Sequence, residues 1–388
     1  MNKFRHDPSA RIRLGVEANL QQFDWLTEPV MTAHRQFTYK NKTEGKEFAV
    51  PISATPVVIE GVGLLVVSDD GYIRFMDFKF AKVFWEHRLS ASIYSSPVFA
   101  PEIDAVIVAS TNGKIVALSL NGTLKWQINT EDPIYASVVI SQHRLFVACF
   151  NRAFHAFDVH TGKVCFSLKL NPSWSVAAGG IASFRDPYAT PCVQRDGSVV
   201  VACGESLTCY SPDGEPNWQT YMQAGIRASP ASSHSTDRVM VGLVNGDVVV
   251  LNGRNGNEVA RISTNAKIVH SPAISNDIAC IANERGDVLG IDLVRLSIVW
   301  AYQAGTEMDY TSITLSPAGD FVFVTKRGNA ICVGAIDGKF LWETSQHLQL
   351  ANHEREMHTT PIITRSGMMF CGSYSGSLYR FNFREKEA

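Results

Sequence analysis

The 388-residue sequence lacks the features that would place it at once in a membrane, secretory or nucleic-acid-binding class. It has no run of about eighteen apolar residues, so no transmembrane helix is expected. Its first ten residues, MNKFRHDPSA, lack the apolar segment of a secretory signal peptide. Lysine and arginine are not clustered and the formal net charge is −2, so we expect neither nucleic acid nor a membrane among its partners.

The eight cysteines also lack the spacing of a metal or redox site. They are scattered through apolar, strand-like segments, without a Cys-x-x-Cys pair or two adjacent cysteines. We therefore expect buried, reduced thiols in a cytoplasmic protein, with disulfides or metal binding as the alternative. A zinc-protease helix is not predicted either, because His353 and His358 are five residues apart and the motif needs four.

What the sequence does contain is a repeat of about forty residues. Each copy begins with Ser/Thr-Pro or a degenerate version, and two β-rich runs joined by a tight turn follow. After a second turn, often containing glycine, a last β-run carries an aromatic residue. Such short strands with turns between them are typical of propeller blades. The copies start at Thr55, Ser96, Ser137, Thr190, Ser229, Ser271, Ser312 and Thr360, and the aromatic residues are Trp85, Trp126, Phe166, Trp218, Trp300 and Trp342.

The eight copies predict an all-β fold, a single eight-bladed β-propeller of four-stranded antiparallel blades between residues 50 and 383. Because one blade cannot bury both of its faces, the aromatic residue is expected to wedge against the neighbouring blade. The Gly-x-x-x-Trp pattern resembles the tryptophan-docking repeat of the quinoprotein, or PQQ-like, propeller family. This resemblance implies the propeller fold.

The last copy has three β-runs and then the chain ends, while the N-terminal region contains an unassigned segment, Phe23–Thr27. We expect residues 1–28 to supply the missing outer strand of the last blade, which would leave no free edge in one domain spanning residues 1–388. The alternative is a disordered N-terminal arm.

The residue two places before each Ser/Thr start is expected to ring the mouth of the central channel, where propeller sites usually lie. On its two sides the sequence mostly has isoleucine and a small residue. Large polar side chains at this one position therefore favour a site. The ring positions are Ser53, Tyr94, Tyr135, Tyr188, Arg227, Val269, Tyr310 and His358.

The ring suggests ligand binding by an aromatic wall and a cation. Tyr94, Tyr135 and Tyr188 would supply rings with hydroxyl tips, and Arg227 a fixed fork for a carboxylate or phosphate. His270, which replaces a small residue beside the ring, is a further candidate for ligand binding. The expected ligand is a small anionic or polar aromatic molecule. The alternative is that the tyrosines only plug the channel with stacked rings.

If the protein is an enzyme, we expect proton transfer by His358 or Tyr310, with Asp309 as an orienting or charge-balancing group. Such chemistry needs no metal ion and suits a lyase, cyclase or isomerase step in a biosynthetic pathway. Whether the protein is catalytic stays open. The alternative is a protein-interaction scaffold that uses the same face and its long connections, 29–51, 171–186 and 346–357.

The family resemblance also implies a PQQ-dependent dehydrogenase, which holds the quinone above calcium, commonly with an adjacent-cysteine disulfide. The sequence departs from this pattern, since the cysteine pair is missing. Calcium prefers several carboxylates, and the ring positions with their direct neighbours offer only Asp309. We therefore expect no cofactor. Related propellers also act as assembly scaffolds of the bacterial envelope, and similar repeats follow acyl-adenylating domains in larger proteins.

Overall fold

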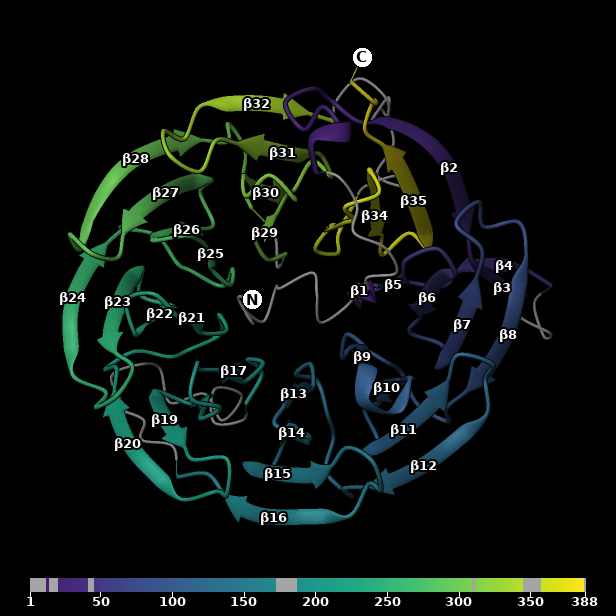
Figure 1. Cartoon of the computed structure of the whole chain (residues 1–388), viewed down its shortest axis with the longest axis horizontal. Helices are drawn as coiled ribbons and strands as arrows, with labels where there is room; N and C mark the ends of the chain where they lie inside the picture. Colours follow the sequence, from purple (N-terminus) through teal and green to yellow (C-terminus); the bar gives the residue numbers. More distant parts are fainter. Residues whose placement is uncertain are drawn as a thin grey trace.

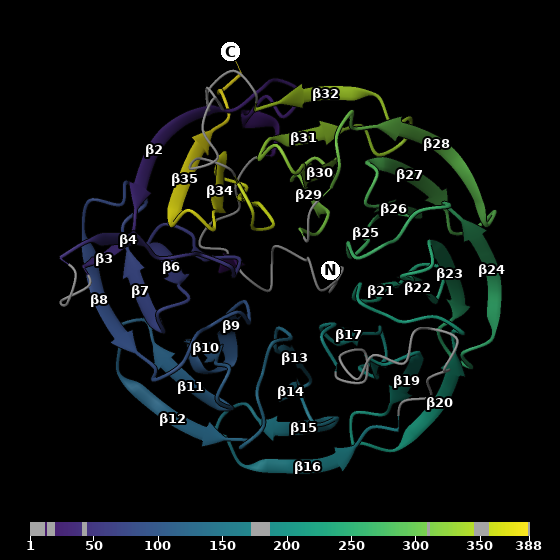
Figure 2. The ribbon, with the colours of Figure 1, turned by 180° about the vertical axis from the view of Figure 1, so that it is seen from behind.

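The computed structural model describes residues 12–13, 20–40, 45–171, 187–308, 311–344 and 357–386. In these ranges the chain forms eight antiparallel sheets that follow one another around a common centre (Figure 1). The view from behind shows the same closed ring (Figure 2). The predicted all-β, eight-bladed propeller is therefore confirmed.

Each blade runs from an innermost to an outermost strand, and the innermost strands begin two residues after the predicted Ser/Thr starts. Blade 1 contains β5 (Val57–Ile59), β6 (Gly63–Val67), β7 (Tyr72–Met76) and β8 (Val83–Arg88), and blade 2 contains β9 (Val98–Ala100), β10 (Ala105–Ala109), β11 (Lys114–Ser119) and β12 (Leu124–Asn129). Blade 3 contains β13 (Val139–Ser141), β14 (Arg144–Cys149), β15 (Ala153–Asp158) and β16 (Val164–Lys169), and blade 4 contains β17 (Cys192–Val193), β18 (Val199–Cys203), β19 (Ser206–Tyr210) and β20 (Pro216–Tyr221). Blade 5 contains β21 (Ala231–Ser233), β22 (Arg238–Gly242), β23 (Asp247–Asn252) and β24 (Glu258–Ser263), and blade 6 contains β25 (Ala273–Ser275), β26 (Ile278–Ala282), β27 (Asp287–Asp292) and β28 (Ser297–Gln303). Blade 7 contains β29 (Thr314–Leu315), β30 (Phe321–Val324), β31 (Ala330–Val333) and β32 (Phe340–Glu343), and blade 8 contains β33 (Ile362–Ile363), β34 (Met368–Gly372), β35 (Ser377–Asn382) and β2 (Val30–Gln36). Short 3-10 helices are η2 (Leu20–Gln22) and η3 (Pro101–Ile103).

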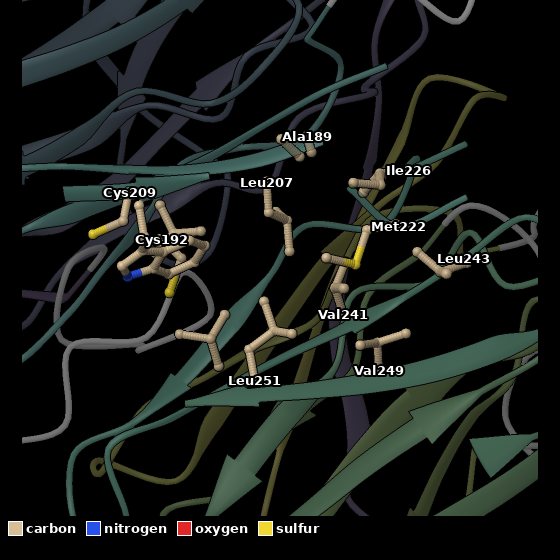
Figure 3. Close-up of a cluster of buried hydrophobic side chains, with 14 of the residues drawn as sticks. Ala189, Cys192, Leu207, Cys209, Met222, Ile226, Val241, Leu243, Val249 and Leu251 are labelled. Carbon is tan, nitrogen blue, oxygen red and sulfur yellow. The ribbon is translucent and has the colours of Figure 1, made fainter. Parts of the chain in front are cut away.

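The hydrophobic core lies between neighbouring blades. Strands such as β10 and β18 are buried along their whole length, because another blade covers each face of the sheet. At the seam between blades 4 and 5, Leu207 packs in one cluster with Val241 and Leu251 of the next blade (Figure 3). Every blade therefore depends on its two neighbours for burial.

A set of hydrogen bonds joins the inner ends of the blades, and we call it the hydroxyl girdle. The backbone N–H of the Ser/Thr at the start of one blade donates to the side-chain hydroxyl at the same position in the next blade, at 2.8–3.1 Å. The bonds lead from Thr55 to Ser96, Ser137, Thr190, Ser229 and Ser271, and again from Ser312 to Thr360. The girdle explains why the repeat needs a hydroxyl there.

The aromatic residue of the outer strand joins the blades at the rim. Trp218 in blade 4 donates its indole N–H to the carbonyl of Gly253 in blade 5 at 2.8 Å. A Cβ atom on Gly256, in the turn of blade 5, would lie 2.6 Å from that indole. Only glycine therefore fits at this position of the turn without displacing Trp218. The corresponding indole bonds of Trp85, Trp126 and Trp300 reach Leu120, Val159 and Ala335.

The ring is closed by the N-terminal region, but by a later segment than the sequence predicted. The outer strand of blade 8 is β2 at Val30–Gln36, which pairs antiparallel with β35, whereas the prediction placed it at Phe23–Thr27. The Phe23–Thr27 segment instead replaces the turn that other blades have at this point. Trp342 of blade 7 donates to the carbonyl of Trp25 at 3.0 Å, as the other tryptophans donate to the turn of the next blade. The C-terminal region lies beside this segment, since Phe23 and Glu385 form an isolated antiparallel β-bridge.

The connection predicted at 29–51 is therefore more than a loop. It contains the closing strand β2 and a hairpin of β3 (Thr38–Lys40) and β4 (Glu47–Ala49). A further strand, β1 (Ile12–Arg13), pairs in parallel with β5 of blade 1. The other two long connections fall mostly outside the described residues.

Alternating arginine and aromatic side chains tie the closing strand to blade 1. The guanidinium carbons of Arg35 and Arg74 lie 5.2 and 5.1 Å from the ring centre of Phe37. Arg74 and Arg88 in turn lie 4.4 and 5.0 Å from the ring centre of Tyr72. Because cation–π contacts are favourable, this row holds the closing strand against blade 1.

Removing one hydroxyl of the girdle should destabilise the propeller. In Ser229→Ala the buried N–H of Thr190 loses its acceptor, so we expect unfolding to cost about 1–3 kcal/mol less than in the wild type, measured by urea denaturation. Ser229→Thr should keep most of the stability. Ser232→Ala, which removes a buried hydroxyl outside the girdle, is the control, and an equal loss in both alanine variants would contradict the role of the girdle.

Alanine substitutions at two glycines distinguish the cost of backbone strain from the cost of disturbing the rim contact of Trp218. Gly305 and Gly256 have φ of +70° and +72°, but a Cβ on Gly305 meets no atom within 4 Å. We expect Gly305→Ala to lose about 1 kcal/mol from backbone strain alone. Gly256→Ala should lose about 1–3 kcal/mol more, because the methyl group displaces Trp218. Thermal and urea unfolding measure the difference, and equal losses would show that the indole moves away freely.

Trp25 should contribute strongly to closure, since its side chain is 5% exposed and packs on Phe383 at 4.9 Å between ring centres. We expect Trp25→Ala to lower the unfolding free energy by about 3–5 kcal/mol. Leu26→Ala is the control, because Leu26 is 59% exposed and should cost at most about 0.5 kcal/mol. An unchanged melting temperature for Trp25→Ala would mean that the N-terminal segment does not hold the ring closed.

Candidate functional site

The ring positions face the centre of the propeller. All of them except Tyr310 lie in the described ranges, and each is at least partly exposed. The residues that follow them in the sequence are at most 3% exposed, from Ala54 in blade 1 to Thr359 in blade 8. The isoleucines on the other side, such as Ile93 and Ile134, are fully buried. Of these three consecutive positions, only the ring position therefore has a side chain that lines the mouth of the channel.

Three of the predicted tyrosines form a continuous aromatic wall with Phe150. Tyr94 stacks on Tyr135 with ring centres 5.6 Å apart and planes 10° apart. Phe150 lies 4.4 Å from Tyr135 and meets Tyr188 edge-on at 4.7 Å. We call these four residues, which come from blades 2, 3 and 4, the aromatic arc.

Arg227 extends the arc into blade 5. Its guanidinium carbon lies 4.2 Å from the ring centre of Tyr188, and its side chain is partly exposed. Stacking engages the flat face of the guanidinium, whereas its N–H donors point outward in the plane. The contact therefore orients Arg227 and leaves this geometry suited to an anion beside an aromatic surface.

Blades 8 and 1 contribute a histidine and a carboxyl group. His358 stacks on Tyr374 with ring centres 4.5 Å apart, and its Nδ1 lies 3.2 Å from the hydroxyl of Ser373. Ser53 donates to Asp69 at 3.0 Å. Burial raises the pKa of Asp69 to about 6, although the bond from Ser53 acts in the opposite direction. Asp69 therefore changes its charge close to neutral pH.

Three predicted residues are not part of this arrangement. His270 occupies the position of a small residue and is fully buried, so its side chain does not line the mouth. Asp309 and Tyr310 lie outside the described residues, so their roles stay predictions from the sequence. Of the predicted site residues, it brings together Tyr94, Tyr135, Tyr188 and Arg227, and it places His358 in blade 8.

Sequence reasoning missed Phe150, which belongs to a second layer of the mouth. This layer is formed by the residue that begins the turn after the second strand of a blade. Its backbone N–H donates to the connection that leads into the same blade, as from Phe150 to Pro133 at 2.8 Å and from Asp69 to Pro51 at 3.0 Å. In blade 1 this residue lies two places before the turn glycine, as Asp69 before Gly71. Blade 3 has Arg152 in place of that glycine, so Phe150 can be located only by its alignment with the other blades.

The described residues offer no obvious metal or thiol chemistry. No group of three or more His, Cys, Asp and Glu side chains within them has the arrangement of a metal site, so the calcium of quinoprotein dehydrogenases finds no matching ligands there. All eight cysteines are free thiols, and all but Cys165 are buried. Burial raises the pKa of Cys149 and Cys371 to about 12, which keeps both thiols protonated and poorly nucleophilic. No helix among the described residues is long and apolar enough to span a membrane.

Comparison with solved structures gives the fold. BamB from Moraxella catarrhalis superposes with a TM-score of 0.69 at 12% identity, covering 92% of this chain and 100% of that one. Sqt1 from Saccharomyces cerevisiae gives 0.70 at 11% identity, with 92% and 99% covered. A europium-containing methanol dehydrogenase gives 0.68 at 12% identity, with 97% and 96% covered. At these identities the likeness concerns the fold alone.

Sequence comparison gives one relative and a family. The β-alanine-activating enzyme of Drosophila melanogaster is 24% identical over 208 residues, which are 50% of this chain and 20% of that enzyme. The chain therefore spans about a fifth of the length of this curated relative. The family described as outer membrane protein assembly factor BamB matches over residues 41–164, 112–344 and 204–388. Because these overlapping matches cover all eight blades, the chain belongs to this family of PQQ-like β-propellers.

Proposed function

We propose that this protein is a binding propeller whose channel mouth holds a small ligand with a flat ring and an anionic group. The observation that carries the proposal is the aromatic arc with Arg227 at its end. The ligand ring would pack on the arc, and its carboxylate or phosphate would bind the guanidinium edge. This class of ligand matches the one expected from the ring positions in the sequence.

The exposure of the arc supports binding over a purely internal role. Tyr94 is 39% exposed and Tyr135 is 36% exposed, although both belong to a stacked array. Tyrosine combines a large apolar surface with few rotatable bonds, so a partner can bury it at small entropic cost. Contacts between the rings already restrain the side chains, which reduces that cost further.

The charge at the end of the arc gives the proposed preference for anions. Arg227 is restrained by Tyr188 at 4.2 Å, and the other ring positions of blades 2–4 are uncharged. A ligand that stacks on Tyr135 or Tyr188 would thus have the nearest cation of the ring positions, Arg227, at one of its ends only. This asymmetry favours a ligand with its anionic group at one end of the ring system.

Catalysis and location remain predictions. A lyase, cyclase or isomerase reaction would use His358, Tyr310 and Asp309, and only His358 of these belongs to the described residues. Its ring is held between Tyr374 and Ser373, an arrangement that also serves packing. A cytoplasmic location follows only from the sequence composition.

A protein-interaction scaffold is the second candidate, and the β3–β4 hairpin favours it. Tyr39 and Phe48 stack across this hairpin with ring centres 5.6 Å apart and are 52% and 39% exposed. Exposed aromatic pairs are frequent in protein interfaces. The description of the family is that of an outer membrane protein assembly factor. A protein partner that binds at the β3–β4 hairpin is therefore the main alternative to a small ligand.

The proposal is tested with naphthoate, a flat ring with one carboxylate, and with neutral naphthylmethanol, by calorimetric titration. Tyr135→Ala should weaken the binding of both probes, because the stacking surface is interrupted. Arg227→Gln should weaken naphthoate by about tenfold and leave naphthylmethanol unchanged, since only the charge-assisted bond is lost.

Tyr221→Ala is the matched control, because Tyr221 is 41% exposed on the outer strand β20, away from the mouth. It should bind both probes like the wild type. Absence of naphthoate binding at millimolar concentration, or an equal effect of the two tyrosine variants, contradicts the proposal. Capture of a protein partner that depends on Tyr39 and Phe48 in the absence of probe binding would establish the scaffold function instead.

A further inference from the structure

A charged cavity of about 440 Å³ lies between blades 6 and 7. It includes the ring position Val269, so it opens at the mouth of the channel, and it shares no residue with the aromatic arc or Arg227. Its volume falls in the range of small-molecule sites. The cavity is lined by Lys267, Val269, Glu284, Arg285, Glu307, Met308 and Lys326.

The walls of the charged cavity are fixed by backbone hydrogen bonds. The N–H of Glu284 donates to Lys267 at 2.9 Å, the N–H of Met308 to Glu284 at 3.2 Å, and the N–H of Lys326 to Glu307 at 2.9 Å. These bonds join two inter-blade connections to the turns of blades 6 and 7. The cavity is therefore built before any ligand arrives, which lowers the entropic cost of binding.

The charges in the cavity are not balanced pairwise. Lys326 forms an ion pair with Glu307. Within the part of the chain that the structure describes, Lys267 and Arg285 form no ion pair, although both line the same cavity from different elements. Glu284 is the other carboxylate among the described lining residues, which therefore supply three cations and two anions. A small anion would correct this excess of positive charge.

The apolar part of the lining indicates that the anion belongs to an organic molecule. Met308 is 5% exposed, and Val269 stands beside it in the lining. A bare inorganic ion would fill only a fraction of 440 Å³. A carbon skeleton against Met308 and Val269, with its anionic group toward Lys267 and Arg285, uses the whole cavity.

We propose that the charged cavity is a second binding site, which takes the phosphate or carboxylate group of a small non-aromatic organic anion through Lys267 and Arg285. The site goes beyond the function proposed for the aromatic arc, because its residues and its ligand are different. Arg285 supplies a planar fork for two oxygens and Lys267 a compact charge, a combination that suits both kinds of anion.

The test is calorimetric titration of the full chain with glycerol phosphate and with succinate, and with glycerol as the neutral blank. We expect saturable binding of at least one of the two anions and none of glycerol, and the stronger of the two identifies the preferred group. Arg285→Gln and Lys267→Gln should each weaken binding by about tenfold. Glu307→Gln should strengthen it, because Lys326 is then released toward the ligand.

A control variant and the choice of probes keep this site separate from general charge effects and from the aromatic arc. Arg254→Gln makes the same change of net charge at an 80% exposed side chain that pairs with Asp237 in blade 5, and it should bind like the wild type. Neither anion carries a ring that could pack on the aromatic arc, so failure of the arc proposal would not remove this site. An equal loss in Arg254→Gln and Arg285→Gln overturns the proposal, as does absence of binding of both anions. Weaker binding in Glu284→Gln also overturns it, since loss of a carboxylate from the lining should strengthen the binding of an anion.

Discussion

The hydroxyl girdle is the interaction on which the geometry of the propeller depends. The N–H at the start of each inner strand is buried and precedes the first ladder hydrogen bond of its own blade, so it needs an acceptor from elsewhere. In six of the blades the hydroxyl of the next blade supplies it, at 2.8 Å between Thr190 and Ser229. The length of one hydrogen bond thus sets the spacing of the blades at the centre, and the tryptophan contacts set it at the rim.

This frame decides where the sequence is free to vary. The girdle and its flanking residues must be small or aliphatic because they are buried, as Ala136 and Ile134 are around Tyr135. The ring position between them faces the channel and carries no such requirement. The repeat therefore builds a nearly symmetric body with an asymmetric mouth, aromatic in blades 2–4 and charged in blades 5–7. Functional differences within such a family are expected at the mouth.

The sequence predicted what the repeat encodes and failed where the repeat is broken. Period, strand order, girdle hydroxyls and rim tryptophans recur in most blades, so they could be aligned. The closing strand could not, because β2 has no turn glycine or tryptophan of its own, whereas Trp25 looks like the missing aromatic residue. Its position follows from Trp342, which needs a backbone acceptor where the chain is interrupted. Phe150 was missed because only one of the two residues per blade that reach the mouth was considered.

The closure of the ring of blades also affects ligand binding at the two candidate sites. In an open array of repeats the terminal units are the least stable, whereas a closed ring has no terminal blade. Here the pairing of β2 with β35 replaces the covalent turn that joins the third and outer strands of the other blades. The bond of Trp342 to Trp25 supports this pairing, and the contacts of Arg35 and Arg74 with Phe37 hold β2 against blade 1. A loss of these contacts would open blade 8 between β35 and β2, and the blades on either side would lose a fixed neighbour. The preorganisation of both candidate sites therefore depends on contacts at the ends of the chain, although neither site contains a residue from the closing segment.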